Sequence, residues 1–135
     1  MAVEVPLSRR LHDTGGAHDE PGARCTCVRT LDGDHRCVVV RIEGELDALV
    51  QPQFRRALDD AVRAAADAVV IDLRATLFLS LRAAAALGDV QAPAARRGVD
   101  VRLVTARPEV ERSLELTGVR GRFHRYSSLR AAMTV

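Results

Sequence analysis

The chain has 135 residues, of which 47% are hydrophobic and 3% are aromatic, and its formal net charge is +2 at pH 7. This length suits one domain, and the balanced charge and scarce aromatic rings argue against a nucleic-acid partner. No apolar run reaches the roughly 20 residues that cross a bilayer, so no direct membrane insertion is expected. Charged residues near the N-terminus interrupt any secretory leader, which predicts a cytoplasmic protein.

The first 23 residues are expected to form a disordered tail, because they combine glycine, proline and charge with little apolar periodicity. Residues 24–135 are then the folded domain, which has a typical size. Two short segments with strand-like composition, 25–31 and 37–42, flank a turn sequence at 32–34 and predict a hairpin. Residues 44–47 are expected to follow as a surface turn.

Strands and helices alternate through the rest of the domain. Helical spacing of apolar residues begins at Pro52, a residue that suits the first helical position. Further strands are predicted at 69–73, 99–104 and 122–126, and further helices at 81–96, 108–117 and from Leu129 onward. Pro93 is expected to kink or shorten its helix. This order indicates a single α/β domain with a mixed, mostly parallel sheet, an N-terminal antiparallel hairpin strand and about four helices.

The junction between residues 69–73 and the helix at 81–96 places a helix N-terminus beside the sheet edge, where α/β folds usually keep working residues. Ser80 is expected to cap this helix by accepting a hydrogen bond from the N–H of Arg82 or Ala83. Thr76 is expected to shape the preceding loop. The helix dipole disfavours a cation at Arg82, so we expect its side chain to extend into solvent or to pair with an acidic partner group.

Three local motifs, in order and at the right spacing, resemble the STAS domain family, named after sulfate transporters and anti-sigma factor antagonists. The motifs are Gly44-Glu45-Leu46-Asp47, the strand at 69–73 followed by Phe78-Leu79, and the stretch 107–119. The resemblance covers residues 25–135 in one register and implies a compact STAS-like α/β domain. It also implies a regulatory protein without enzymatic activity or a cofactor.

In the best-known members of this family, an anti-sigma factor that is also a kinase phosphorylates a serine within an Asp-Ser-Ser/Thr-Gly motif. Here the same positions read Ser80-Leu81-Arg82-Ala83, so Arg82 stands where those members carry the phosphorylated serine. A guanidinium cannot accept phosphate. We therefore expect no phosphorylation, with Ser80 as the one remaining candidate, and a binding module without the usual switch.

The resemblance implies that the chain binds an anti-sigma factor, a histidine-kinase-like ATPase, and thereby frees a sigma factor. The expected partner-binding residues are Asp47, Thr76, Phe78, Ser80, Leu81, Arg82 and Ala83. An alternative within the same fold is a STAS subunit of an ABC-type membrane transport complex, because members of that type also lack the serine.

Another alternative is a cysteine-based metal or redox sensor. Cys25, Cys27, His35 and Cys37 fall on the predicted hairpin, where residues two apart share a face. Three thiolates and an imidazole would suit tetrahedral zinc. Because the Cys-x-Cys spacing is unlike a zinc knuckle and cysteine is a common small core residue, we predict plain packing and no bound metal.

The remaining titratable residues form no catalytic constellation in the sequence. Asp72 could act as a base, but the expected role of an aspartate at a strand end is to accept hydrogen bonds from the next loop. Glu43, Glu45 and Asp47 are expected to be solvated turn residues that contribute to a docking surface. His124 has no companion acid or nucleophile and is expected to be structural.

Overall fold

The computed structural model describes residues 4–10, 24–32, 35–65 and 67–133. The strands are β1 Glu4–Arg10, β2 Arg24–Asp32, β3 His35–Leu46, β4 Ala68–Asp72, β5 Thr76–Leu79, β6 Asp100–Val104 and β7 His124–Tyr126. The helices are α1 Gln51–Ala64, α2 Leu81–Arg96, α3 Pro108–Leu116 and α4 Leu129–Met133, with short 3-10 turns η1 at Ala48–Val50 and η2 at Arg120–Arg122. The predicted α/β class and its helices are confirmed.

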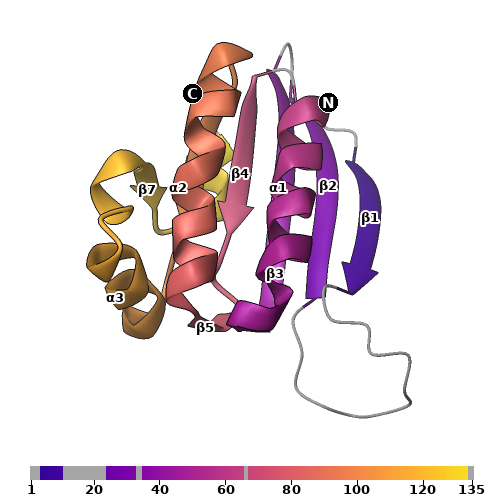
Figure 1. Ribbon diagram of the computed structural model, residues 1–135. Coiled ribbons are helices and arrows are strands. Elements are labelled where there is room, and N and C mark those ends of the chain that lie inside the picture. The colour runs from indigo at the N-terminus through magenta and orange to yellow at the C-terminus, as the bar shows by residue number, and fades with distance from the viewer. Residues whose placement is uncertain (1–3, 11–23, 33–34, 66, 134–135) are drawn as a thin grey trace.

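The sheet has the order β1-β2-β3-β4-β6-β7, and β5 pairs with the end of β3 outside this path. The pairs β1–β2 and β2–β3 are antiparallel, whereas β3–β4, β4–β6, β6–β7 and β3–β5 are parallel. The predicted mixed sheet with an antiparallel N-terminal hairpin is therefore confirmed. Parallel pairing brings the carboxyl ends of β3, β4 and β6 to one edge of the sheet (Figure 1).

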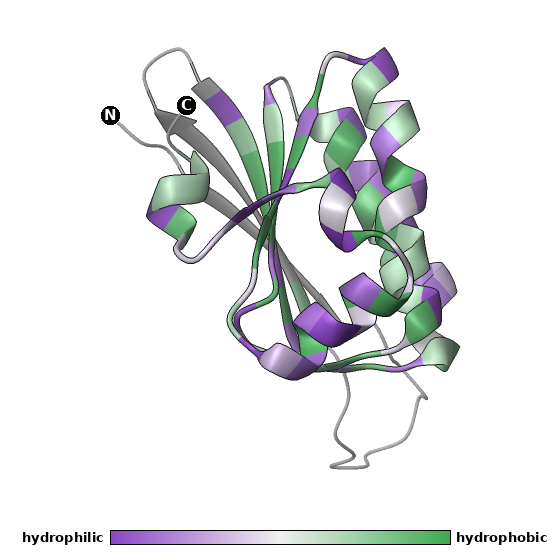
Figure 2. Cartoon of the chain, turned by 90° about the vertical axis from the view of Figure 1, so that its left-hand side faces the viewer, coloured by the Kyte–Doolittle hydropathy of each residue, from purple (hydrophilic) through white to green (hydrophobic). Residues whose placement is uncertain are grey.

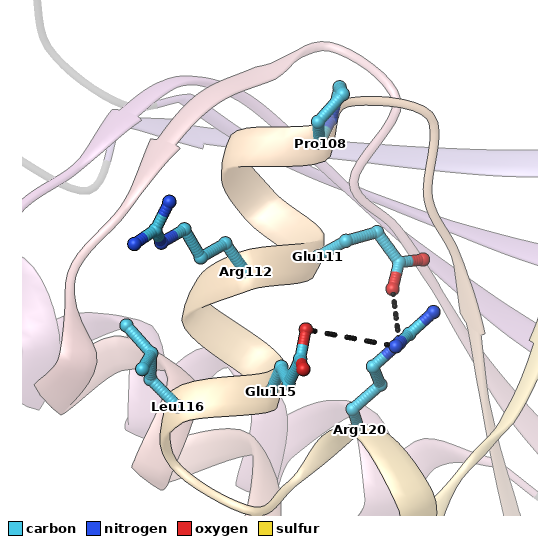
Figure 3. A pocket seen from close by; sticks show the side chains of 6 residues that line it. All are labelled: Pro108, Glu111, Arg112, Glu115, Leu116 and Arg120. Carbon is cyan, nitrogen blue, oxygen red and sulfur yellow. Dashed lines mark hydrogen bonds and ion pairs between the residues drawn. The ribbon is translucent and has the colours of Figure 1, made fainter.

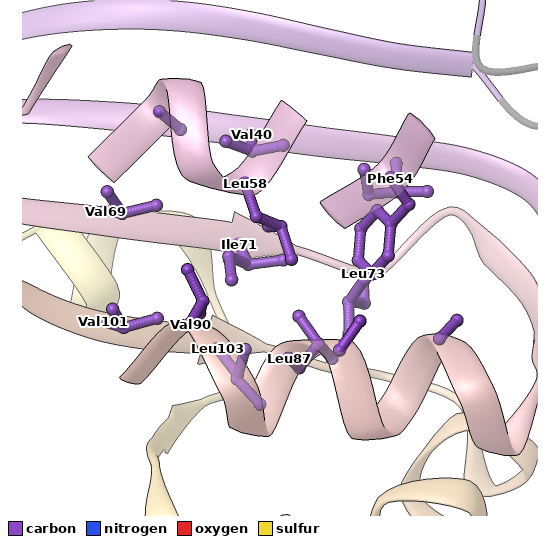
Figure 4. Close-up of a cluster of buried hydrophobic side chains, with 14 of the residues drawn as sticks. Val40, Phe54, Leu58, Val69, Ile71, Leu73, Leu87, Val90, Val101 and Leu103 are labelled. Carbon is purple, nitrogen blue, oxygen red and sulfur yellow. The ribbon is translucent and has the colours of Figure 1, made fainter. Parts of the chain in front are cut away.

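Helices cover both faces of the sheet. α1, α2 and α3 lie on one face and α4 on the other, as the side view shows (Figure 2). Alternate side chains of a strand point to opposite faces of the sheet. Because helices cover both faces, every residue of β4 is buried. The larger core lies between the sheet and helices α1 and α2 (Figure 4), and its members include Val40, Phe54, Leu58, Ile71, Leu87 and Leu103. The smaller core joins Val39, Val70, Val104 and Ala132 beneath α4.

The structure corrects the prediction for the N-terminal tail at residues 4–10. These residues form β1, which pairs with β2 from Glu4 opposite Thr30 to Arg10 opposite Arg24. Pro6 lies within this strand, and an edge strand tolerates proline because one of its sides makes no ladder hydrogen bonds. The β2–β3 hairpin supplies hydrogen-bond partners for the backbone of this segment, and the amino-acid composition of the segment does not reveal such partners. Residues 1–3 and 11–23 lie outside the described residues.

Two further local predictions are wrong. Residues 44–46 continue β3 and do not form a turn, because β5 provides backbone partners on that side. Gly44 has a φ of 91°, and the pairing register shifts between Gly44 and Glu45, so glycine accommodates a bulge at this point. The expected shortening of the next helix at Pro93 is also wrong, because α2 runs through Pro93 to Arg96.

Candidate functional site

Strand β5 connects the carboxyl end of β3 to the start of α2. The sequence predicted a loop here, but Thr76 pairs with Gly44 and Leu79 with Leu46. The buried hydroxyl of Thr76 donates a hydrogen bond of 2.9 Å to the carbonyl oxygen of Ile42. The backbone N–H of Ser80 donates to the carbonyl oxygen of Leu46 at 2.8 Å. The first turn of α2 is therefore held directly against β3.

An ion pair fixes the turn between β4 and β5. The guanidinium of Arg74 donates from Nε to Oδ1 of Asp72 at 2.9 Å and from a terminal nitrogen to Oδ2 at 2.8 Å. The backbone N–H of Arg74 donates to the same carboxylate, as expected for an aspartate at a strand end. Burial raises the pKa of Asp72, but the Arg74 hydrogen bonds and the charges of Arg74 and Arg41 outweigh it and hold the pKa below 3.8. Asp72 is thus a charged structural residue and no general base.

Ser80 is the N-cap of α2, as predicted. Its backbone is extended, with φ −64° and ψ 158°, and its Oγ accepts a hydrogen bond of 3.1 Å from the N–H of Ala83. Only 9% of the residue is exposed. The serine hydroxyl that remains near this helix start is therefore engaged in capping and largely covered.

Arg82 occupies the second position of α2 and is exposed. Among the described residues its guanidinium has no hydrogen-bond or ion-pair partner. By contrast, Arg74, which follows β4 in the chain, is paired with Asp72. An exposed guanidinium that makes no ion pair or hydrogen bond with the described residues therefore lies at the N-terminus of α2, as the sequence predicted.

The expected partner-binding residues divide into an exposed and a buried group. Thr76 and Ala83 are fully buried and Ser80 nearly so, so these three can only position the surface. Phe78 and Leu81 are 48% and 54% exposed. Leu49 and Leu77 are also exposed, although sequence reasoning missed them because nothing in their spacing marks them as surface residues. We name the exposed set the β5–α2 surface: Asp47, Leu49, Leu77, Phe78, Leu81 and Arg82.

Large apolar side chains on a surface are informative when they cluster. Those of the β5–α2 surface come from η1, β5 and the start of α2, which meet at the lower end of the molecule in Figure 1. Leu116 on α3 is the other large hydrophobic residue that is exposed in the described part of the chain. Such a cluster is typical of a protein-binding surface.

The hairpin does not bring Cys25 and Cys37, two of the candidate metal ligands, together. Cys25 lies opposite Ile42 and Cys37 opposite Thr30, which separates them by roughly 17 Å along the strands. Cys25 packs in the larger core, whereas Cys37 has the parity of Val39 and faces the other side of the sheet. Cys27 lies opposite Val40 and His35 opposite Asp32. Cys25 and Cys37, which a zinc site on the hairpin would have to bring together, are therefore apart, and both are buried.

The three acidic residues Glu43, Glu45 and Asp47, at and just beyond the carboxyl end of β3, have different surroundings. Glu43 pairs with Arg41 at 3.2 Å, Glu45 is exposed, and Oδ1 of Asp47 accepts a hydrogen bond of 2.9 Å from the N–H of Leu49. His124 is exposed at the start of β7. Across the described ranges no three histidine, cysteine or acidic side chains gather as a metal site.

A shallow depression of about 400 Å³ lies on α3 and is lined by Pro108, Glu111, Arg112, Glu115, Leu116 and Arg120 (Figure 3). Sequence reasoning missed its central residue, Glu111, which accepts hydrogen bonds from Thr105, Arg120 and Arg125. Burial raises the pKa of Glu111, but the Thr105 hydrogen bond and the two arginine charges lower it below 4.5. These partners come from segments on either side of α3, so the cluster anchors the helix.

No helix in the described part of the chain is long and apolar enough to span a membrane. The profile of the STAS domain family matches residues 29–132. A protein of Mycobacterium tuberculosis (strain ATCC 25618 / H37Rv) named "Putative anti-anti-sigma factor Rv2638" is 31% identical over 117 residues, which cover 84% of this chain and 75% of that protein.

Two solved structures are similar to this one. An anti-sigma factor antagonist from Mycobacterium paratuberculosis superposes with a TM-score of 0.66 and 28% identity, covering 80% of this chain and 90% of that one. The anti-sigma factor antagonist SpoIIAA in its unphosphorylated form shares the fold, with a TM-score of 0.58 and 19% identity over 78% of this chain and 92% of that one. By its family profile, its relative and its fold, the chain belongs to the STAS domain family.

Proposed function

We propose that this chain is an anti-sigma factor antagonist that binds its partner through the β5–α2 surface. The names of the Mycobacterium tuberculosis relative and of the Mycobacterium paratuberculosis structure support this function. In this role the chain is a regulatory binding protein and no enzyme: it occupies an anti-sigma factor, which then releases its sigma factor for transcription.

The observation that carries the proposed site is the cluster of exposed apolar side chains around the start of α2. Phe78 and Leu81 project from a rigid frame, because Thr76 ties β5 to β3 and Ser80 caps the helix. A rigid apolar surface loses little conformational entropy when a partner covers it. Exposed apolar groups at the centre of an interface typically supply most of its affinity.

The second part of the proposal is that no phosphate switch acts at this surface. The guanidinium of Arg82 stands where phosphorylated relatives would carry an acceptor hydroxyl, and the hydroxyl of Ser80 is engaged with the N–H of Ala83. A kinase partner would have to break the cap of α2 to reach that oxygen. Binding would then be set by the amounts of the proteins or by a signal that does not modify this surface.

A reconstituted release assay tests the function. Each anti-sigma factor from the same genome is purified in complex with its sigma factor and titrated with this chain, and the free sigma factor is measured by size-exclusion chromatography. Release from at least one complex is the expected result, and Phe78→Ala should require a roughly tenfold or more higher concentration for it, while Leu116→Ala, on α3, should not. If no complex releases its sigma factor at any concentration of the chain, the proposed function is wrong.

A further inference from the structure

Strand β1 lies at one end of the sheet, and among the described residues it pairs with β2 alone (Figure 1). An edge strand presents backbone N–H and C=O groups on its unpaired side, and a strand from another molecule can pair with them. Because β1 is seven residues long, it offers a strand of ordinary length to such a partner.

Pro6 indicates which backbone groups face outward. Proline has no N–H, yet the pairing of β1 with β2 continues without interruption through Pro6. Its nitrogen therefore lies on the unpaired side of the strand. Because the backbone groups of successive residues point to alternate sides, Glu4, Ser8 and Arg10 also direct their N–H and C=O groups outward. The proline removes one outward N–H and leaves those of the other three residues.

Strand β1 carries opposite charges at its two ends, since it begins with Glu4 and ends with Arg10. Arg10 lies directly opposite Arg24 of β2, and Arg24 lies opposite Glu43 of β3. Like charges directly opposite one another destabilise a sheet. Glu43 already lies on the inner side of this arginine pair. An acidic residue on the outer side of Arg10 would offset the remaining repulsion.

From the unpaired edge and this order of charges we infer that two copies of the chain associate by antiparallel pairing of their β1 strands, about a two-fold axis at Leu7. The axis places Glu4 of each copy opposite Arg10 of the other, and Ser8 opposite Pro6. The N–H of Ser8 then donates to the C=O of Pro6, a bond that needs no N–H from the proline. The same surface is used twice, so the assembly closes as a dimer.

The dimer is weak, because one pair of strands buries less area than a standard interface, and we expect dissociation at roughly micromolar concentration or above. β2 and β3 separate β1 from β5 in the sheet, so pairing at β1 does not cover the β5–α2 surface (Figure 1). If the proposed function is correct, one dimer binds two anti-sigma factors. The dimer does not rest on that function and is tested on the chain alone.

The first test is the molar mass of the purified full chain over a concentration series, measured by sedimentation equilibrium. We expect a monomer–dimer equilibrium that Ser8→Pro weakens roughly tenfold or more, because both copies lose an N–H donor at the interface. Position 8 directs its N–H to the same side as Pro6, so proline there removes no hydrogen bond between β1 and β2. Ser8→Ala, which keeps the N–H, is the matched control and should associate like the wild type.

The second test reverses the charges and leaves the backbone unchanged. Glu4→Arg and Arg10→Glu should each weaken the dimer roughly tenfold or more, because like charges then lie opposite one another at both symmetric positions. The variant that carries both changes should regain at least the wild-type association, since opposite charges again face one another. Arg112→Glu on α3, a charge reversal away from β1, should have no effect.

A chain that stays monomeric throughout the concentration series overturns the inference, even if it releases a sigma factor from an anti-sigma factor. A dimer that Ser8→Pro leaves unchanged overturns it as well. The same holds for a dimer that neither charge reversal weakens, or that the double variant does not restore.

Discussion

The hydroxyl of Thr76 donates a hydrogen bond of 2.9 Å to the carbonyl oxygen of Ile42, and both groups are buried. This bond joins residues 34 positions apart at the point where β5 begins to pair with β3. The exposed residues of β5 and of the start of α2 follow Thr76 in the chain, so this bond helps to position them. The bond therefore links the stability of the domain to the shape of its proposed binding surface.

Replacing Thr76 by valine keeps the side-chain volume but leaves the Ile42 carbonyl oxygen without this donor. Such a loss in a buried site costs about 1–3 kcal/mol of unfolding free energy. Urea denaturation of Thr76→Val measures it. Ser113→Ala, which removes a hydroxyl that donates at 3.3 Å on the surface of α3, is the control and should change stability by less than about 0.5 kcal/mol. Equal effects of both substitutions would contradict a special role for Thr76.

Removing the α2 cap should destabilise the domain. Ser80→Ala leaves the N–H of Ala83 without its acceptor, which costs about 0.5–2 kcal/mol. Ser80→Asp should retain wild-type stability or exceed it, because aspartate also caps helices and its charge suits the helix N-terminus. Thermal denaturation compares them with Ser127→Ala, an exposed serine outside any helix. A Ser80→Ala protein as stable as that control would disprove the capping role.

The Asp72–Arg74 pair predicts a defined pH dependence. The pKa of Asp72 is lower in the folded chain than its ordinary value of 3.8. The carboxylate therefore stabilises the fold above that ordinary value, and this stabilisation is lost as the pH falls through the lower, folded pKa. Asp72→Asn should lower the unfolding free energy by roughly 1–3 kcal/mol at pH 7, because the charged hydrogen bonds to Arg74 are lost. The loss is limited because the partly exposed Arg74 can be solvated by water.

The stability difference between wild type and Asp72→Asn should then shrink as the pH is lowered below 3.8. Denaturation curves at several pH values measure this difference. Asp59→Asn on α1, an acid for which the described residues provide no partner, is the control at pH 7 and should change stability by less than about 0.5 kcal/mol. A constant difference for Asp72→Asn across the same range would show that the ion pair does not stabilise the fold.

Exposed apolar residues of the β5–α2 surface should affect binding far more than stability. Phe78→Ala and Leu81→Ala remove side chains that are about half exposed, so the unfolding free energy should fall by less than about 1 kcal/mol. Their affinity for an anti-sigma factor should fall roughly tenfold or more if they lie at the centre of the interface. Calorimetric titration and thermal denaturation of the same samples separate the two effects, and a loss of affinity matched by unfolding would refute the assignment.

The sequence predicted the helices and strands that show a local signal, such as a regular spacing of apolar residues or a residue typical of a helix start. The apolar run at 69–73, the helical spacing from Phe54 to Val62 and the proline at the start of α3 each reflect a local preference that the tertiary structure supports. The cap at Ser80 was predictable for the same reason, since capping involves residues three apart.

The missed elements depend on partners that are distant in sequence. β5 is a strand because β3 lies beside it, and β1 because β2 offers an edge. The resemblance implied that Thr76 and Ala83 bind the partner, but both are buried, because β5 pairs with β3 and Ala83 packs in the larger core. The separation of Cys25 and Cys37 follows from a hairpin register that spacing alone does not determine.

The central claim is that the chain binds an anti-sigma factor through a surface that carries Arg82 and accepts no phosphate. The most direct measurement incubates the chain with its anti-sigma factor, ATP and magnesium, and then records the intact mass of the chain and its affinity for that partner. We predict an unchanged mass and an affinity equal to that measured without ATP. A phosphate-sized increase in mass, mapped to a residue of the β5–α2 surface or to Ser80 and accompanied by weaker binding, would contradict the account.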